Sequence, residues 1–325
     1  MLNPSAFTTR TALEDFSIRA ANDMTDFIAD EIFQPVIISK ESVKVYQYDT
    51  SNYRVTDTRK DSKGEADLVD YSVFSTNRTA LLHKAAGEYD PADVANFDAV
   101  VANLEQDTAL TIMEQLMLYK ETEAVTAATT SGNYPAALTA TLAADATWIV
   151  AGGDPEGTSG VARAAVKTAC GKAPNAAAMS WSTFEKLRGA PYFVDRMKYT
   201  NASVSEDAFK AMLQQWMGVQ SLAICKAQKN TNIEGAASQA LSDVWDDSVL
   251  FYVKNNSPSP KSMRYGANYI FNQLYTYSYP VVTRGSGKGR IQRIEMGMSY
   301  LLAAGAVVSS SDTDFTAGYL LKNVV

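Results

Sequence analysis

The sequence predicts an α+β fold, because strand signals and helix signals fall in separate blocks along the chain. Alternating apolar and polar residues, the pattern of half-buried strands, run through 43–48 and 69–73 and again through 275–279 and 294–300. A stretch from 91 to about 125 carries apolar residues at the spacing of an amphipathic helix. Between 145 and 265 short helix and strand signals alternate. Blocks of this kind are typical of α+β architecture.

The first 38 residues are expected to form an N-terminal arm. Phe16, Phe27 and Ile32 are scattered through it without a sustained amphipathic stripe, so the arm is expected to need a partner to become ordered. Residues 39–82 follow as two strand signals, separated by a polar, charged stretch that ends at 63–65. This arrangement predicts an extended β-hairpin with a long solvated tip.

A long helix is predicted from residue 91 to about 125, within a segment that spans 83–144. Asp90 can cap the first free N–H groups, Pro91 suits the first helical position, and Asp93 suits the positive helix end. One face is expected to be buried and the other to meet water. The buried set is Val94, Phe97, Val101, Leu104, Ile112, Leu116 and Tyr119, and the solvent set is Glu105, Asp107 and Glu114.

Residues 145–265 are predicted to form a second, α/β domain. Its helices are expected to begin near Thr158 and Ser159, with Gly171 as the stop, and at two capping-box spacings. Those two pairs are Ser182 with Glu185 and Ser203 with Glu206, and the strand signals are Leu222–Cys225 and Val249–Val253. A long hairpin over 266–308 follows, and 309–325 carries a final strand.

The bulk composition limits the classes of protein. The chain of 325 residues is 46% hydrophobic and 20% charged, which is typical of a folded soluble protein. Its net charge of −7 disfavours a protein that mainly grips phosphate backbones. Cys170 and Cys225 lack a CxxC partner and are expected to be buried free thiols. The apolar stretch 300–308 is too short to span a bilayer, and the N-terminus resembles no secretory signal, so a protein made in the cytoplasm is expected.

The sequence carries no recognisable catalytic motif. His83 is the sole histidine and is expected at the surface, at a strand end or helix start, and no nucleophile elbow occurs. The glycine-rich run 284–290 fails the phosphate-loop pattern, and Gly152–Gly153 is expected to be a turn. Carboxylates at 243, 246 and 247 keep a metal-dependent hydrolase as a minor alternative. The sequence therefore predicts no enzyme, no cofactor and no metal.

The order of these segments resembles the Hong Kong 97-like major capsid proteins of tailed bacteriophages. Similar stretches are the helix entry at Asp90–Pro91, 172–175 leading to 179–181 and Leu187, 244–245 before 250–253, and 317–321. The resemblance covers nearly the whole chain and rests on the joint order of its segments. It implies an N-terminal arm (1–38), an extended loop (39–82), a peripheral domain with a spine helix (83–144), an axial domain (145–265), a return to the peripheral domain (266–308) and a last strand that closes the axial sheet (309–325).

The resemblance also implies a function. The chain would assemble with itself, as hexamers and pentamers, into an icosahedral shell around double-stranded DNA in the virion. It would be assembled in the host cytoplasm with portal and scaffolding or decoration proteins as partners, and without contact with a membrane. A shell of the encapsulin type, which holds cargo enzymes, is the alternative.

Charged residues at two tips are candidates for contacts between subunits. They are Arg59, Lys60, Lys63 and Glu65 on the extended loop, and Arg284, Lys288, Arg290 and Arg293 on the C-terminal hairpin. The second group has two further readings, a flexible basic tip or a contact with enclosed DNA.

Overall fold

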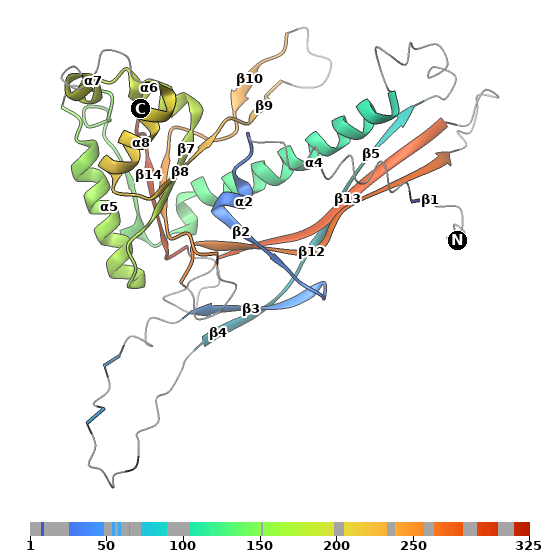
Figure 1. The fold of residues 1–325 in the computed structure, drawn as a ribbon, viewed down its shortest axis with the longest axis horizontal. Coiled ribbons are helices and arrows are strands. Elements are labelled where there is room, and N and C mark those ends of the chain that lie inside the picture. Colours follow the sequence, from blue (N-terminus) through green and yellow to red (C-terminus); the bar gives the residue numbers. More distant parts are fainter. Residues whose placement is uncertain are drawn as a thin grey trace.

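A computed structural model provides the three-dimensional structure of the chain. It describes residues 8–9, 26–48, 54–55, 58–59, 65, 73–89, 104–150, 152–197, 205–232, 238–256, 263–281, 291–304 and 315–325. Figure 1 shows a compact α/β unit at one end, a long sheet and helix α4 running away from it, and a hairpin of β3 and β4 leaving the lower side. The predicted α+β class is confirmed.

The compact unit is built on a five-stranded sheet in the order β6-β14-β11-β7-β8. Its strands are β6 (Thr139–Thr141), β14 (Gly318–Lys322), β11 (Val249–Tyr252), β7 (Ala176–Ser180) and β8 (Ser221–Cys225). The central strands β7 and β11 are buried along their whole length, which is why they are continuous apolar or small-residue runs. The predicted strands at 222–225 and 249–253 are confirmed. The last strand, β14, joins this sheet between β6 and β11.

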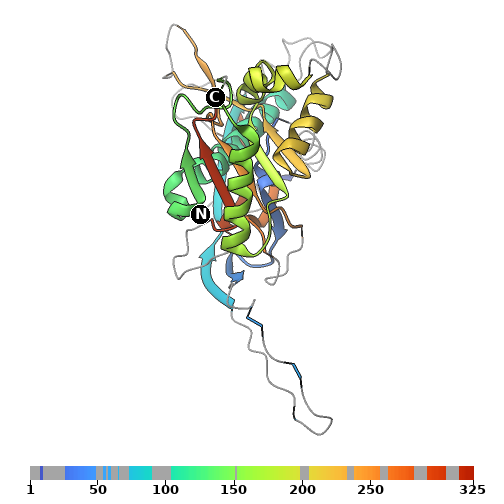
Figure 2. The ribbon, with the colours of Figure 1, turned by 90° about the vertical axis from the view of Figure 1, so that its left-hand side faces the viewer.

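The described part of this unit contains the α-helices α5 (Pro155–Cys170), α6 (Trp181–Arg188), α7 (Pro191–Met197) and α8 (Glu206–Met217). Viewed from the side in Figure 2, α5 lies in front of β14, which it contacts. The predicted stop at Gly171 is confirmed, because this glycine has a φ of 76° in the left-handed region.

The predicted helix starts are wrong by a few residues. Asp154, not Thr158 or Ser159, caps α5, since its Oδ1 accepts from the Gly157 N–H at 2.8 Å. Ser180 caps α6 through the Thr183 N–H at 3.1 Å, so Ser182 is already inside the helix. Ser205 caps α8 in place of Ser203. In each case the side chain that caps the helix is the one directly before its first residue, and it lies two to five residues before the predicted cap or two residues after it.

The elongated part is a second five-stranded sheet. β12 (Gly266–Val281) and β13 (Ile291–Ala304) form the long hairpin predicted from the alternating pattern. β5 (Leu81–Tyr89) pairs with β13 at one edge, while β1 (Thr8–Thr9) and β2 (Phe33–Ile37) pair with β12. Ile294, Met296, Met298 and Tyr300 are all buried, as alternation predicts.

Helix α4 (Leu104–Thr129) covers this sheet through Ala109, Ile112, Met113 and Leu116. The helix ends four residues beyond the expected limit, and its expected start near Asp90 lies outside the described residues. The prediction of a buried Tyr119 is wrong, because its side chain is 53% exposed. In the C-terminal half of α4 the buried positions are 120, 121, 124, 125 and 128. This half packs on α2 and the compact unit, whereas the N-terminal half packs on β13.

The extended hairpin consists of β3 (Ser42–Tyr48) and β4 (Val73–Thr79), paired antiparallel. Its second strand begins at the end of the predicted run 69–73, and residues 69–72 lie outside the described part. Val45 anchors the hairpin base to the long sheet beside Ala267, Tyr269 and Ala303. A smaller hairpin, β9 (Gln228–Asn230) with β10 (Leu241–Asp243), leaves the compact unit on the other side (Figure 1).

Part of the predicted arm is docked on its own chain. Helix α2 (Ala29–Ile32) and strand β2 bury Ile28, Ile32 and Phe33 in the main core. The expectation that this region needs a partner to become ordered is therefore wrong for residues 28–33. Both cysteines are buried and free, as predicted. None of the described helices is long and apolar enough to cross a bilayer.

Candidate functional site

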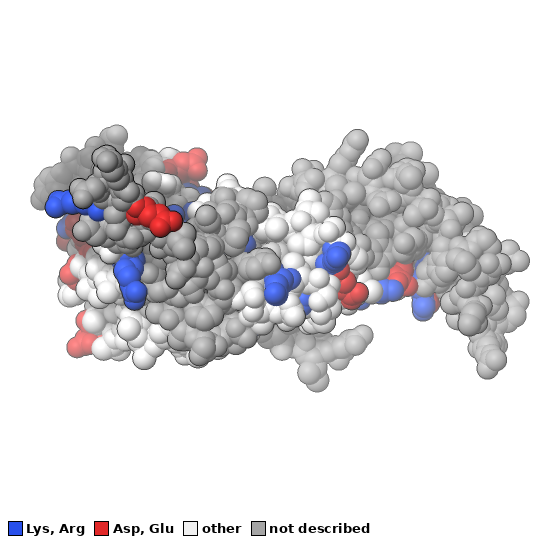
Figure 3. Space-filling model, turned by 90° about the horizontal axis from the view of Figure 1, so that it is seen from below, with Lys and Arg blue, Asp and Glu red and all other residues white. Residues whose placement is uncertain are grey.

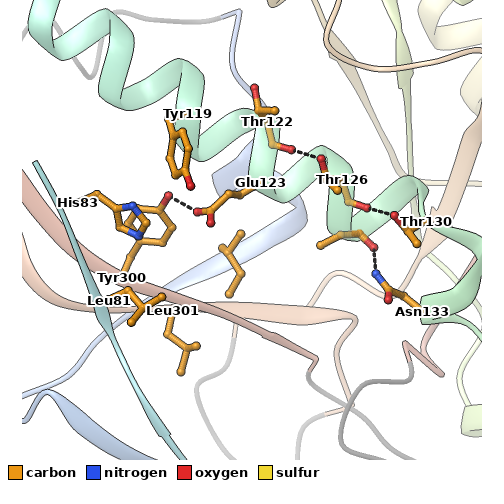
Figure 4. Close-up of a pocket in the computed structure, with 12 residues that line it drawn as sticks. Leu81, His83, Tyr119, Thr122, Glu123, Thr126, Thr130, Asn133, Tyr300 and Leu301 are labelled. Carbon is orange, nitrogen blue, oxygen red and sulfur yellow. Dashed lines mark hydrogen bonds between the residues drawn. The ribbon is translucent and has the colours of Figure 1, made fainter. Parts of the chain in front are cut away.

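A groove of about 660 Å³ lies between helix α4 and the edge of the long sheet. Side chains from α4, from edge strand β5, from β13 and from the short 3₁₀ turn Ser131–Asn133 line it (Figure 4). Leu81, at the start of β5, is 63% exposed beside it, and Tyr119 of α4 is also half exposed. The lining residues are Leu81, His83, Tyr119, Thr122, Glu123, Thr126, Ala127, Thr130, Asn133, Tyr300, Leu301 and Leu302.

One end of this groove is an aromatic and carboxylate cluster. The Tyr300 hydroxyl donates to Oε2 of Glu123 (Figure 4). Burial, and then this hydrogen bond, raise the pKa of Tyr300 well above its ordinary value, so the phenol stays protonated and remains the donor. The His83 ring stacks on Tyr300 with centroids 4.4 Å apart, and Tyr119 lies 5.4 Å from the His83 ring. These rings fix one wall of the groove.

The helical wall carries a row of threonines. Thr122, Thr126 and Thr130 each donate their hydroxyl to the backbone carbonyl four residues earlier, at 2.8, 2.6 and 2.6 Å. The Asn133 amide donates to the Ala127 carbonyl at 2.9 Å. The three hydroxyl hydrogens and one of the two Asn133 amide hydrogens are thus used within the chain, whereas each side-chain oxygen keeps lone pairs. The threonine row therefore offers hydrogen-bond acceptors to the groove.

A second polar cluster fastens residues 28–30 to the body. Glu121 of α4 is fully buried and accepts from the Ile28 N–H at 3.1 Å and the Ala29 N–H at 2.8 Å. The Cys225 thiol of β8 donates to the same carboxylate at 3.4 Å. Burial raises the pKa of Glu121, although the two backbone hydrogen bonds act against it. Lys120 adds an ion pair to Asp30 at 2.7 Å.

The residues predicted at the two tips are not brought together in the described part of the chain. Arg59 and Glu65 are exposed on the extended loop, while Lys60, Lys63, Arg284, Lys288 and Arg290 lie outside the described residues. Arg293 contacts Glu88 of the neighbouring strand, with its Nε at 2.8 Å. On the face seen in Figure 3, the basic and acidic side chains of the described residues are interspersed. Contact with another subunit stays a prediction for all eight.

The residues considered for catalysis have structural partners. His83 lies within β5, half-buried against Tyr300, so its expected place at an exposed strand end or helix start is wrong. Asp243 accepts from Gln228 at 3.1 Å, and Asp246 accepts from the Ser248 N–H at 3.1 Å. Within the described ranges no group of three histidine, cysteine, aspartate or glutamate side chains could hold a metal ion.

The groove and the Glu121 cluster were not predicted. Glu121 and Glu123 look like solvent-facing residues of an amphipathic helix, and their partners lie far away in the sequence. The one available signal was the neighbouring pair Lys120–Glu121, which interrupts the apolar spacing of the helix.

Known proteins with a similar sequence or structure include phage and phage-related proteins. No protein-family model matches the sequence. The chain is 22% identical over 304 residues to the major capsid protein of Burkholderia phage BcepMu, covering 92% of each chain. A phage-related protein from Bordetella bronchiseptica RB50 has a similar crystal structure, with a TM-score of 0.70, 17% identity and 98% of each chain covered.

Two shell structures are more distant. The capsid of cyanophage P-SCSP1u gives a TM-score of 0.53 at 10% identity, covering 91% of this chain and 88% of that one. A virus-like particle from Pyrococcus furiosus gives 0.51 at 11% identity, covering 96% and 98%. The fold is that of phage capsid proteins, and the resemblance predicted from the sequence is confirmed. The BcepMu protein and the cyanophage protein are structural capsid proteins, not enzymes.

Proposed function

We propose that this chain is the major capsid protein of a tailed bacteriophage. Its copies associate as hexamers and pentamers that close an icosahedral shell around packaged double-stranded DNA. The observation that carries the proposal is the relative of that name, which aligns with 92% of both chains, together with the shared fold. The subunit would be made in the host cytoplasm, would have its place in the virion, and would meet portal and scaffolding or decoration proteins there.

The shape of the subunit supports self-assembly. The β3–β4 hairpin leaves the body, and in the described residues Val45 anchors its base (Figure 1). An extension of this kind buries little surface on its own chain and gains contacts from neighbours. The long sheet also ends in an edge strand, β5, beside the groove. These features suit a subunit whose surface is completed by other copies.

The overall negative charge suits enclosure of DNA rather than a tight grip on it. The one predicted DNA-facing cation that the structure describes, Arg293, is paired with Glu88. A surface with interspersed charges releases few counterions on contact with DNA and gives weak, sequence-independent binding. The genome would then be retained by the closed shell.

A second candidate is a shell of the encapsulin type that encloses cargo enzymes. The similarity to a virus-like particle supports it, because the same fold closes that shell. The two candidates differ in their contents and not in their subunit architecture.

Expression of the full chain alone, followed by size-exclusion chromatography and negative-stain electron microscopy at two concentrations in moderate salt, tests self-assembly. Closed shells or stable hexamers are expected. A compact monomer at both concentrations would contradict the proposal. Mass spectrometry and nuclease treatment of particles from infected cells then separate the candidates: nuclease-protected double-stranded DNA supports the capsid, and a stoichiometric second protein without DNA supports the compartment.

A further inference from the structure

We propose that the groove between α4 and β5 receives a lysine or arginine side chain from a second copy of this chain, with Glu123 as its anionic partner. The inference rests on the proposed function, since it names a contact within the assembled shell.

The threonine row and the Glu123 carboxylate present hydrogen-bond acceptors to the groove, which favours a guest that donates. The three threonine hydroxyls and the Asn133 amide donate to carbonyls of their own chain. The Tyr300 hydroxyl donates to Glu123 Oε2, and no contact of the described residues occupies Oε1 of that carboxylate. An ammonium or guanidinium group has donors and no acceptor, so it matches this surface.

The aromatic wall adds a second feature suited to a cation. The His83 ring contacts both Tyr119 and Tyr300, and Tyr119 is half exposed. A cation over a tyrosine face gains energy from the ring, and the methylene stem of lysine or arginine can pack on apolar neighbours such as Leu81 and Leu301. Among the residues that the structure describes, the lining holds no lysine or arginine that would repel the guest.

No lysine or arginine of the described residues lines the groove, so the described part of the chain does not supply this cation itself. The β3–β4 hairpin runs away from the body (Figure 1). Copies that carry a net charge of −7 repel each other, so their contacts need local pairs of opposite charge. A basic side chain of a neighbour supplies one.

The test compares two matched variants of the full chain, Glu123→Gln and Glu114→Gln. Both remove one charge from α4, but Glu114 is exposed and lies outside the groove. Glutamine at 123 still accepts from Tyr300, so the fold is kept. Light scattering and sedimentation give the protein concentration at which half of the chain is assembled. We expect E123Q to raise it roughly tenfold, as loss of a hydrogen bond to a charged group does, with a weaker dependence on NaCl than wild type.

A photoreactive p-benzoylphenylalanine in place of the exposed Tyr119 then identifies the guest. A cross-link to a segment of another copy that contains lysine or arginine supports the inference. Cross-links confined to the same chain, or to a segment without a basic residue, overturn it. Equal assembly of E123Q and E114Q, with wild type forming shells, overturns this inference and leaves the proposed function intact, whereas failure of wild type to assemble overturns the proposed function itself.

Discussion

The buried carboxylate of Glu121 is predicted to hold the segment 28–33 on the body of the subunit. Glu121→Ala leaves the N–H groups of Ile28 and Ala29 without their acceptor in a site that water does not reach. Each unsatisfied buried amide costs about 1–3 kcal/mol, so docking should lose roughly 2–6 kcal/mol. Relief of the buried charge offsets part of this, and we expect a value near 2 kcal/mol, or roughly a 30-fold shift toward the undocked state.

Hydrogen exchange measured by mass spectrometry on peptides that cover residues 26–37 follows this change directly. Protection should fall roughly 30-fold in these peptides, in line with the estimated free energy. Exchange in β7 and β11 should change little, because these two strands pair with each other and not with residues 28–33. Glu114→Ala, at an exposed position of the same helix, is the control. Unchanged protection of Ile28 and Ala29 in the Glu121 variant would refute this account of the anchor.

Three further outcomes are expected. Burial raises the pKa of Glu121 above its ordinary 4.5, so docking of residues 28–33 favours the protonated carboxyl and should be strongest below pH 4.5 and weaken as pH rises through the raised pKa. Protection factors of peptides covering 26–37 should follow this trend, and Glu121→Ala should flatten it. Ser180→Ala should cost about 1 kcal/mol in urea unfolding and Ser182→Ala clearly less, since Ser180 caps α6; equal losses would contradict the observed cap. Phe33→Ala should cost roughly 3–5 kcal/mol in the same assay, and a loss below 1 kcal/mol would show that Phe33 is not in the core.

Local patterns predicted most of the architecture. The alternation at 294–300 placed four buried side chains correctly, because a strand has only two faces and one of them meets α4. Gly171 ended α5 where the sequence indicated, since the left-handed backbone there favours glycine. The predicted cap of α6 was wrong, because Ser182 and Glu185 have the spacing of a capping box. In the structure Glu185 instead forms an ion pair with Arg188, with Oε1 and Nη1 3.8 Å apart.

The candidate site could not be predicted from one sequence. Its parts come from residues 81–83, 119–133 and 300–302, and only the pairing of β5 with β13 and the packing of α4 bring them together. The apolar spacing of α4 in the sequence also cannot show that the helix packs on the long sheet in its first half and on α2 and the compact unit in its second half. That change buries Lys120 and Glu121 and exposes Tyr119, the reverse of what residue type alone suggests.

The two carboxylates of α4 explain how one helix can serve both the subunit and its assembly. Glu121 and Glu123 are two positions apart, which is roughly 200° around a helix, so they face nearly opposite sides. Glu121 is enclosed by residues of its own chain and is satisfied there by backbone amides and a thiol. Glu123 faces the open groove, and its carboxylate accepts one hydrogen bond from the described part of its own chain, that of the Tyr300 hydroxyl. Loss of Glu121 should therefore loosen the isolated subunit, whereas Glu123→Gln, which keeps the acceptor for Tyr300, should change behaviour only when a second copy is present.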